Sequence, residues 1–113
     1  MVYLVPSDVA KATVEQINNS PYSIQTGYEL ALNELRRNYS PIPKSELQDG
    51  KCYGVISVHF QHVTSQPDKA YLEVWTYHAK GAYRKDTDML VSENAWNAIC
   101  EKRVTESMVL CKI

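Results

Sequence analysis

The stretch GVISVHFQHVTSQPDKAYLEVWTYH, residues 54–78, decides the fold. It holds two runs rich in β-branched and aromatic residues, and the segment between them contains a proline and an aspartate, which favour a turn. The sequence therefore predicts a β-hairpin with strands 51–63 and 70–79. We expect Thr64 to pair with Ala70 across this hairpin.

Alternate residues of a strand point to opposite sides of the sheet, so the predicted register separates two sets of side chains. One side is aliphatic and is expected to face the core: Ile56, Val58, Phe60, Leu72 and Val74. The other side, which we call the ring side, mixes rings with hydrogen-bonding groups: Ser57, His59, Gln61, Tyr71, Glu73, Trp75 and Tyr77. Two interpretations stay open, because rings of this kind build either an exposed interaction surface or a second core under another element.

The rest of the chain predicts helices on one face of this sheet. The β-prone run 2–5 ends at a proline and is expected to form an edge strand. Apolar residues recur at helical spacing in 8–17, with Ser7 as the N-cap, and in 23–37, whereas 38–50 is rich in proline and predicts a loop that ends in an Asp-Gly turn.

Towards the C-terminus we expect one more helix and one more strand. Residues 81–89 are polar and predict an irregular segment, and Ser92 is the expected N-cap of a helix whose apolar stripe includes Trp96. The apolar run 104–113 predicts a final strand. The fold class is therefore α+β: a mainly antiparallel sheet of about four strands with three helices. A chain of 113 residues is expected to form a single globular domain, residues 1–113.

Composition excludes several classes of protein. A net charge of −1 gives no overall field that would attract nucleic acid or an anionic membrane. No window approaches the ~18 apolar residues of a membrane span, and no secretory leader is visible, so we expect no membrane partner. The three cysteines, Cys52, Cys100 and Cys111, lack the C-x-x-C spacing of zinc and redox sites, which favours free thiols and a cytoplasmic location.

The residues that could carry chemistry form no complete motif. His59 and His62 have a spacing seen in metal sites, but residues three apart on a strand point to opposite sides, so we expect no metal and no cofactor. No glycine-rich phosphate loop or hydrolase motif occurs, which favours a function other than catalysis. One enzyme hypothesis remains: His59 and Glu73 lie diagonally, about 7 Å apart in the predicted register, and could act as base and acid in a metal-independent ribonuclease.

A second alternative is binding of nucleic acid or a nucleotide. The segment from Tyr77 to Lys85 interleaves aromatic rings with Lys80 and Arg84, a combination that single-stranded nucleic acid uses for stacking and charge neutralisation.

The favoured prediction is a small protein-binding module. It would inhibit or regulate a larger protein, as immunity-type proteins and phage accessory factors do, by means of the ring side. The expected binding residues are His59, Tyr71, Glu73, Trp75, Tyr77, Lys80, Tyr83 and Arg84. A homodimer could use the same surface. If the ring side is exposed, changing both Trp75 and Tyr77 to alanine should abolish binding and leave the fold intact.

Overall fold

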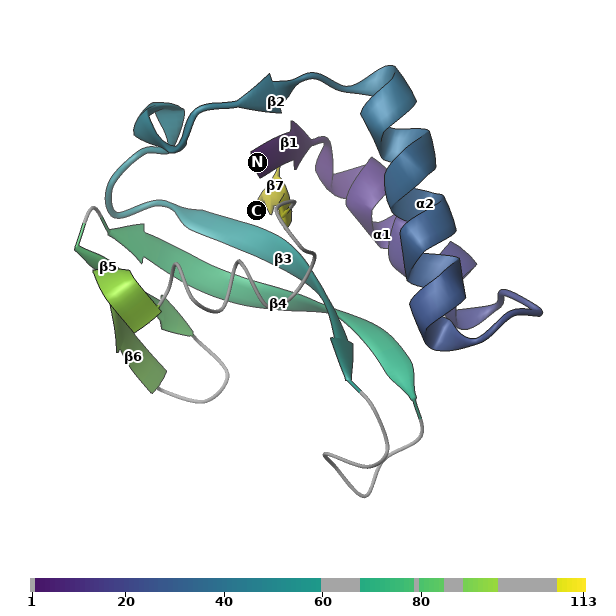
Figure 1. The fold of residues 1–113 in the computed structure, drawn as a ribbon. Coiled ribbons are helices and arrows are strands. Elements are labelled where there is room, and N and C mark those ends of the chain that lie inside the picture. Colours follow the sequence, from purple (N-terminus) through teal and green to yellow (C-terminus); the bar gives the residue numbers. More distant parts are fainter. Residues whose placement is uncertain (1, 60–67, 79, 85–88, 96–107) are drawn as a thin grey trace.

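The computed structural model describes residues 2–59, 68–78, 80–84, 89–95 and 108–113. The strands are β1 (Val2–Val5), β2 (Pro41–Ile42), β3 (Cys52–His59), β4 (Lys69–His78), β5 (Gly81–Arg84), β6 (Met89–Ser92) and β7 (Met108–Lys112). They form one seven-stranded sheet in the order β2-β1-β7-β3-β4-β5-β6 (Figure 1). The helices are α1 (Ser7–Asn18) and α2 (Ile24–Asn38), with a short 3₁₀ helix, η1 (Lys44–Glu46).

The α+β class is confirmed, but the sheet is larger than the sequence indicated and it is mixed. β1 pairs in parallel with β7, and the other neighbours pair antiparallel. β5 and β6 lie within or next to the segment 81–89 that was expected to be irregular, and β2 lies inside the predicted loop 38–50. These strands have two to four residues each, so their formation depends on pairing with a neighbouring strand more than on local composition. β1, expected at an edge, lies between β2 and β7.

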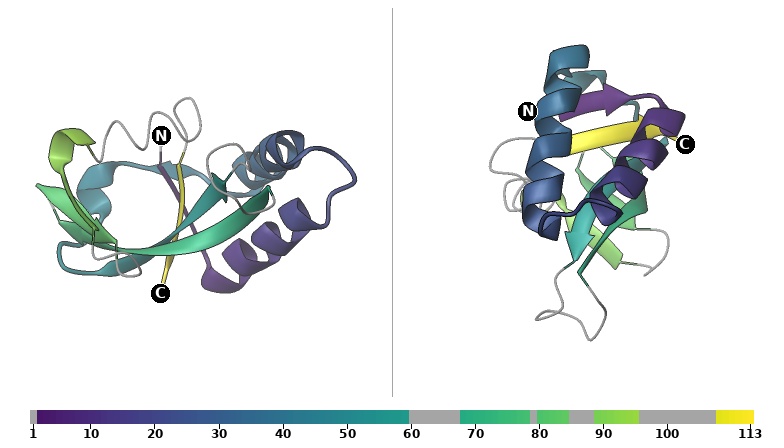
Figure 2. Two further views of the ribbon diagram at one scale, coloured as in Figure 1. Left: turned by 90° about the horizontal axis from the view of Figure 1, so that it is seen from below. Right: turned by 90° about the vertical axis from the view of Figure 1, so that its right-hand side faces the viewer.

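The two long helices cover one side of the sheet (Figure 2). Their apolar stripes pack on that side through Ala10, Ile17, Tyr28, Ala31, Leu32 and Leu35. Ser23 caps α2 as predicted, because its hydroxyl accepts a hydrogen bond from the Thr26 N–H. Ser7 is instead the first helical residue of α1, and Pro6 occupies the N-cap position. Within the described residues, no helix has both the length and the apolar character needed to cross a bilayer.

Ser92 also caps a helical turn, because its hydroxyl accepts a hydrogen bond from the Ala95 N–H at 3.2 Å. Residues 93–95 are helical, and the rest of the predicted helix, including Trp96 and Cys100, lies outside the described residues.

The predicted hairpin is present, with a different register. Ala70 pairs with Val58 instead of Thr64, so β4 is shifted by six residues relative to β3. Because six is an even number, the paired residues of β3 and β4 keep their predicted sides of the sheet. Phe60 and Gln61 lie outside the described residues. The aliphatic side packs under α1 and α2 as expected: Ile56 is buried there, and Val58 and Leu72 are partly buried against the same cluster.

The opposite side of the sheet holds a second core. Its buried members come from five strands and from the segment after η1: Val2, Leu47, Tyr53, Val55, Trp75, Ala82 and Leu110. Tyr77 packs against this cluster and is partly buried. The sheet therefore buries apolar side chains on both sides. This explains why consecutive residues of its central strands, and not only every second residue, carry large side chains.

Candidate functional site

The ring side of the hairpin forms part of the second core. Trp75 is 1% exposed and Glu73 is 3% exposed, so the expectation that these two residues lie on an open surface is wrong. The pattern of alternation was correct, but alternation alone does not tell which of two apolar sides is covered. Here Val2 of β1, Ala82 of β5 and Leu110 of β7 pack in the same cluster as Trp75.

Polar groups on the ring side are engaged with their neighbours. The Ser57 hydroxyl donates a hydrogen bond to the Glu73 carboxylate, and both residues are buried. The Lys69 ammonium lies 5.3 Å from the centroid of the half-buried Tyr71 ring, within the range of a cation–π contact. Tyr77 meets the edge of Tyr53 with the ring planes at 88°. These contacts stabilise the fold of the hairpin.

The two residues of the ribonuclease hypothesis are not neighbours in the observed register. His59 faces Lys69, whereas Glu73 faces Val55, four positions further along β3. Four positions of a strand correspond to about 13 Å, compared with the expected diagonal of about 7 Å. In the structure the Glu73 carboxylate accepts a hydrogen bond from the Ser57 hydroxyl.

The segment from Tyr77 to Lys85 is divided between the two sides of the sheet. Tyr83 pairs with Thr76 and Tyr77 pairs with Ala82, so the two tyrosine rings lie on opposite sides and do not form one stacking platform. Lys80 is exposed in the turn between β4 and β5. Arg84 pairs with Trp75 in the register of β4 and β5, and Lys85 lies outside the described residues.

Beyond the helices, no other described residue covers the aliphatic side of the sheet. α1 and α2 pack on β3, β4 and β7, whereas β5 and β6 lie at the far end of the sheet (Figures 1 and 2). The pairing register places the following residues on this uncovered side, which we call the open surface: Thr76, His78, Tyr83, Leu90 and Ser92. Thr76 and Tyr83 are half-buried, and the other three are exposed.

A hollow of about 340 Å³ lies in the open surface. It is lined by His78, Lys80, Gly81, Leu90 and Ser92. Leu90 is 73% exposed, which makes it one of the most exposed large apolar side chains in the described part of the chain. An apolar side chain beside a histidine, a lysine and a hydroxyl gives a surface that can accept both an apolar group and a hydrogen-bonding or anionic group.

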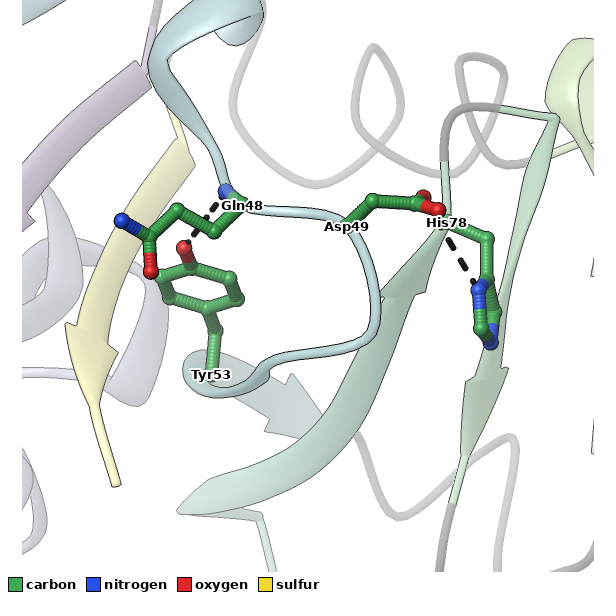
Figure 3. Close-up of polar contacts among 4 residues, drawn as sticks. All are labelled: Gln48, Asp49, Tyr53 and His78. Carbon is green, nitrogen blue, oxygen red and sulfur yellow. Dashed lines mark hydrogen bonds and ion pairs between the residues drawn. The ribbon is translucent and has the colours of Figure 1, made fainter.

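His78 is oriented by the turn that precedes β3. Its Nδ1 lies 3.8 Å from the Asp49 carboxylate, as Figure 3 shows. The turn itself is fixed, because the Gln48 N–H donates to the Tyr53 hydroxyl at 2.9 Å and the Gly50 N–H donates to the Tyr77 carbonyl at 2.8 Å. Gly50 has φ +77°, a conformation that glycine adopts without strain, so the predicted Asp-Gly turn is confirmed. Both side chains of the pair are exposed, so the pair contributes little to the stability of the fold.

The sequence analysis did not identify Asp49, His78, Leu90 or Ser92 as candidate site residues. The Asp-Gly turn was visible, but the strand that its carboxylate would face depends on the register of β4, which the sequence did not determine. Leu90 was missed because β6 itself was missed.

A second hollow, of about 250 Å³, lies between α1 and α2. Its rim groups bind one another: the Gln16 amide donates to the Glu34 carboxylate, and the Asn38 amide donates to the Glu34 carbonyl. These polar groups are therefore already hydrogen-bonded, and the open surface is the better candidate site.

Within the described residues, no group of three or more His, Cys, Asp or Glu side chains could hold a metal ion. Comparison with known proteins gives no further guide, because no protein-family model, curated protein or solved structure matches this chain.

Proposed function

We propose that the protein is a small cytoplasmic binding module that inhibits or regulates a larger protein, and that it contacts this partner through the open surface. The observation that carries the proposal is the position of Leu90, an apolar side chain that is 73% exposed beside a hollow and next to the half-buried Tyr83, which faces it across β5 and β6. Exposed apolar groups flanked by polar ones are typical of protein-binding surfaces, and tyrosine is enriched among the residues that dominate their affinity.

The site differs from the one that the sequence favoured. Of the eight residues named there, Lys80 and Tyr83 lie at the open surface or its rim. Trp75 is buried in the second core and Glu73 is buried beside Ser57, so they would influence binding only by changing the stability of the sheet.

The test is capture of the partner from a lysate of the native host. Wild-type protein and three variants would serve as bait: Tyr83→Ala and Lys80→Glu at the open surface, and Leu30→Glu as a matched control. Leu30 is 49% exposed on α2, far from the open surface. A partner should be recovered by wild-type protein and by Leu30→Glu, and at least about tenfold less by Tyr83→Ala. Each variant must give the circular dichroism spectrum of the wild type. Equal recovery by Tyr83→Ala, or loss with Leu30→Glu, would contradict the proposal.

Nucleotide or nucleic-acid binding is the second candidate, because Lys80 and His78 line the same hollow. It predicts affinity for single-stranded oligonucleotides that falls with salt concentration and is lost in Lys80→Glu. A protein-binding module has no such affinity, so this measurement separates the two candidates.

A further inference from the structure

The two outer edges of the sheet are protected to different degrees. β2, at one edge, has two residues, and prolines occupy positions 41 and 43, where they cannot donate a backbone hydrogen bond. β6, at the other edge, has the sequence MLVS, with neither a proline nor a charged side chain. In the described part of the chain β6 pairs with β5 alone. Unprotected edges of this kind accept a further strand.

At the start of β4, beyond the residues that pair with β5, a side chain protects the edge of the strand. There the Asn18 side-chain amide binds both backbone groups of Ala70: the Ala70 N–H donates to Asn18 Oδ1 at 2.7 Å, and Asn18 Nδ2 donates to the Ala70 carbonyl at 3.1 Å. A side chain thus occupies the place of a neighbouring strand at this position. β6 lacks an equivalent cover among the described residues.

The pairing pattern determines which backbone groups of β6 point outwards. Tyr77 exchanges backbone hydrogen bonds with Gly50 and Lys51, on the β3 side of β4. Because these directions alternate along a strand, Thr76 and His78 bond to β5. The same alternation applies along β5 and β6, so the backbone groups of Met89 and Val91 form the hydrogen bonds to β5. The N–H and C=O groups of Leu90 therefore point away from the sheet.

Leu90 therefore combines outward backbone groups with an exposed apolar side chain. Two identical strands can satisfy these groups when they run antiparallel about a two-fold axis perpendicular to the sheet. With Leu90 at the axis, each Leu90 N–H meets the carbonyl of the same residue in the other copy. The two leucine side chains lie on the same side of the joined sheet and shield each other from water.

We propose that β6 pairs with β6 of a second copy, so that the protein is a homodimer with one continuous sheet. The occupant is a second copy because the edge is self-complementary at Leu90 in both backbone and side chain. The pairing does not require the proposed function. It adds to it, because the two-fold axis places both open surfaces on the same side of the dimer, where a partner can contact them together.

The first test is the state of association in solution. Sedimentation equilibrium from about 1 µM to about 1 mM should show a monomer–dimer equilibrium for wild-type protein. Leu90→Lys places a charge on the edge and should be monomeric, whereas the matched variant Leu30→Lys should dimerise like the wild type. A wild-type monomer at every concentration overturns the proposal, as does a dimer that Leu90→Lys retains.

The second test is a cross-link at the axis. Directly opposed residues of a hydrogen-bonded antiparallel pair have Cα atoms about 5.5 Å apart, which a disulfide can span. Leu90→Cys should therefore form a disulfide with itself on mild oxidation, identified by mass spectrometry of the 90–90 linked peptide, and Leu30→Cys should not. A dimer whose Leu90→Cys form gives no such peptide would show that the copies meet elsewhere. Association is measured in the absence of a partner, and partner capture is measured with Tyr83→Ala. A wild-type monomer overturns the dimer alone, whereas full capture by Tyr83→Ala overturns the proposed function alone.

Discussion

The Asn18 side chain binds both the N–H and the C=O of Ala70 and so replaces a strand at the start of β4. Asn18 is the last residue of α1, and Ala70 is 1% exposed at the second position of β4. One amide side chain thereby fixes the helical layer to the sheet and closes a stretch of open strand edge.

We expect Asn18→Ala to lower the free energy of unfolding by about 1–2 kcal/mol, because two hydrogen bonds to a buried residue are lost. Urea denaturation measures this change, and Asn33→Ala on the exposed side of α2 is the control. Native-state hydrogen exchange should show faster exchange of the Ala70 amide in Asn18→Ala. Unchanged exchange there would mean that the amide is protected by another group.

Trp75→Ala is expected to destabilise the protein by about 3–5 kcal/mol, since it removes a large ring that is 1% exposed in the second core. The sequence led us to expect a tolerated double change of Trp75 and Tyr77 only if the ring side were exposed. Thermal or urea unfolding measures it, with Tyr22→Ala as the control, because Tyr22 is 61% exposed. A stable, well-folded Trp75→Ala protein would show that the second core contributes little to stability.

Ser57→Ala should cost about 1–3 kcal/mol, because the buried Glu73 carboxylate loses the hydroxyl that donates to it. The matched change Ser40→Ala, at an exposed position, should be close to neutral. Urea unfolding of the two variants gives the comparison. Equal stabilities would mean that other groups satisfy the carboxylate once the serine hydroxyl is removed.

Burial raises the pKa of the Cys111 thiol, and hydrogen bonding to the Gly54 backbone opposes this to a smaller extent. Cys111 is also 0% exposed, so little thiolate forms and a reagent cannot reach it. At pH 8 a thiol reagent should therefore modify the partly exposed Cys52 first, and Cys111 only after denaturant is added. Peptide mapping by mass spectrometry measures the order, and equal rates in native buffer would contradict it.

Much of the fold could be predicted from periodicity. The helical spacing predicted α1 and α2, and the β-branched runs predicted β1, β3, β4 and β7. The paired residues of the hairpin were assigned to the correct sides of the sheet, although the register was shifted by six residues. β5 and β6 were missed, because four-residue strands beside polar residues carry little local signal.

The candidate site could be predicted much less. Residues of the open surface lie on β4, β5 and β6, and they come together only through the pairing of Thr76 with Tyr83 and of Tyr83 with Leu90. The predicted exposure of Trp75 was wrong for a related reason, because residues that surround it come from β1, β5 and β7 and from the segment after η1. Sequence patterns report which side of a strand a residue faces, but not which distant strands cover that side.

The position of β7 has a consequence for how the chain folds. β1 and β3 are separated in the sheet by β7 alone, so residues 108–112 join the strands β2 and β1 to the strands β3 to β6. During synthesis, β1 leaves the ribosome more than a hundred residues before β7, and the sheet stays in two unconnected parts until then. Because contacts so distant in sequence form slowly, we expect closure of β7 between these parts to limit the rate of folding.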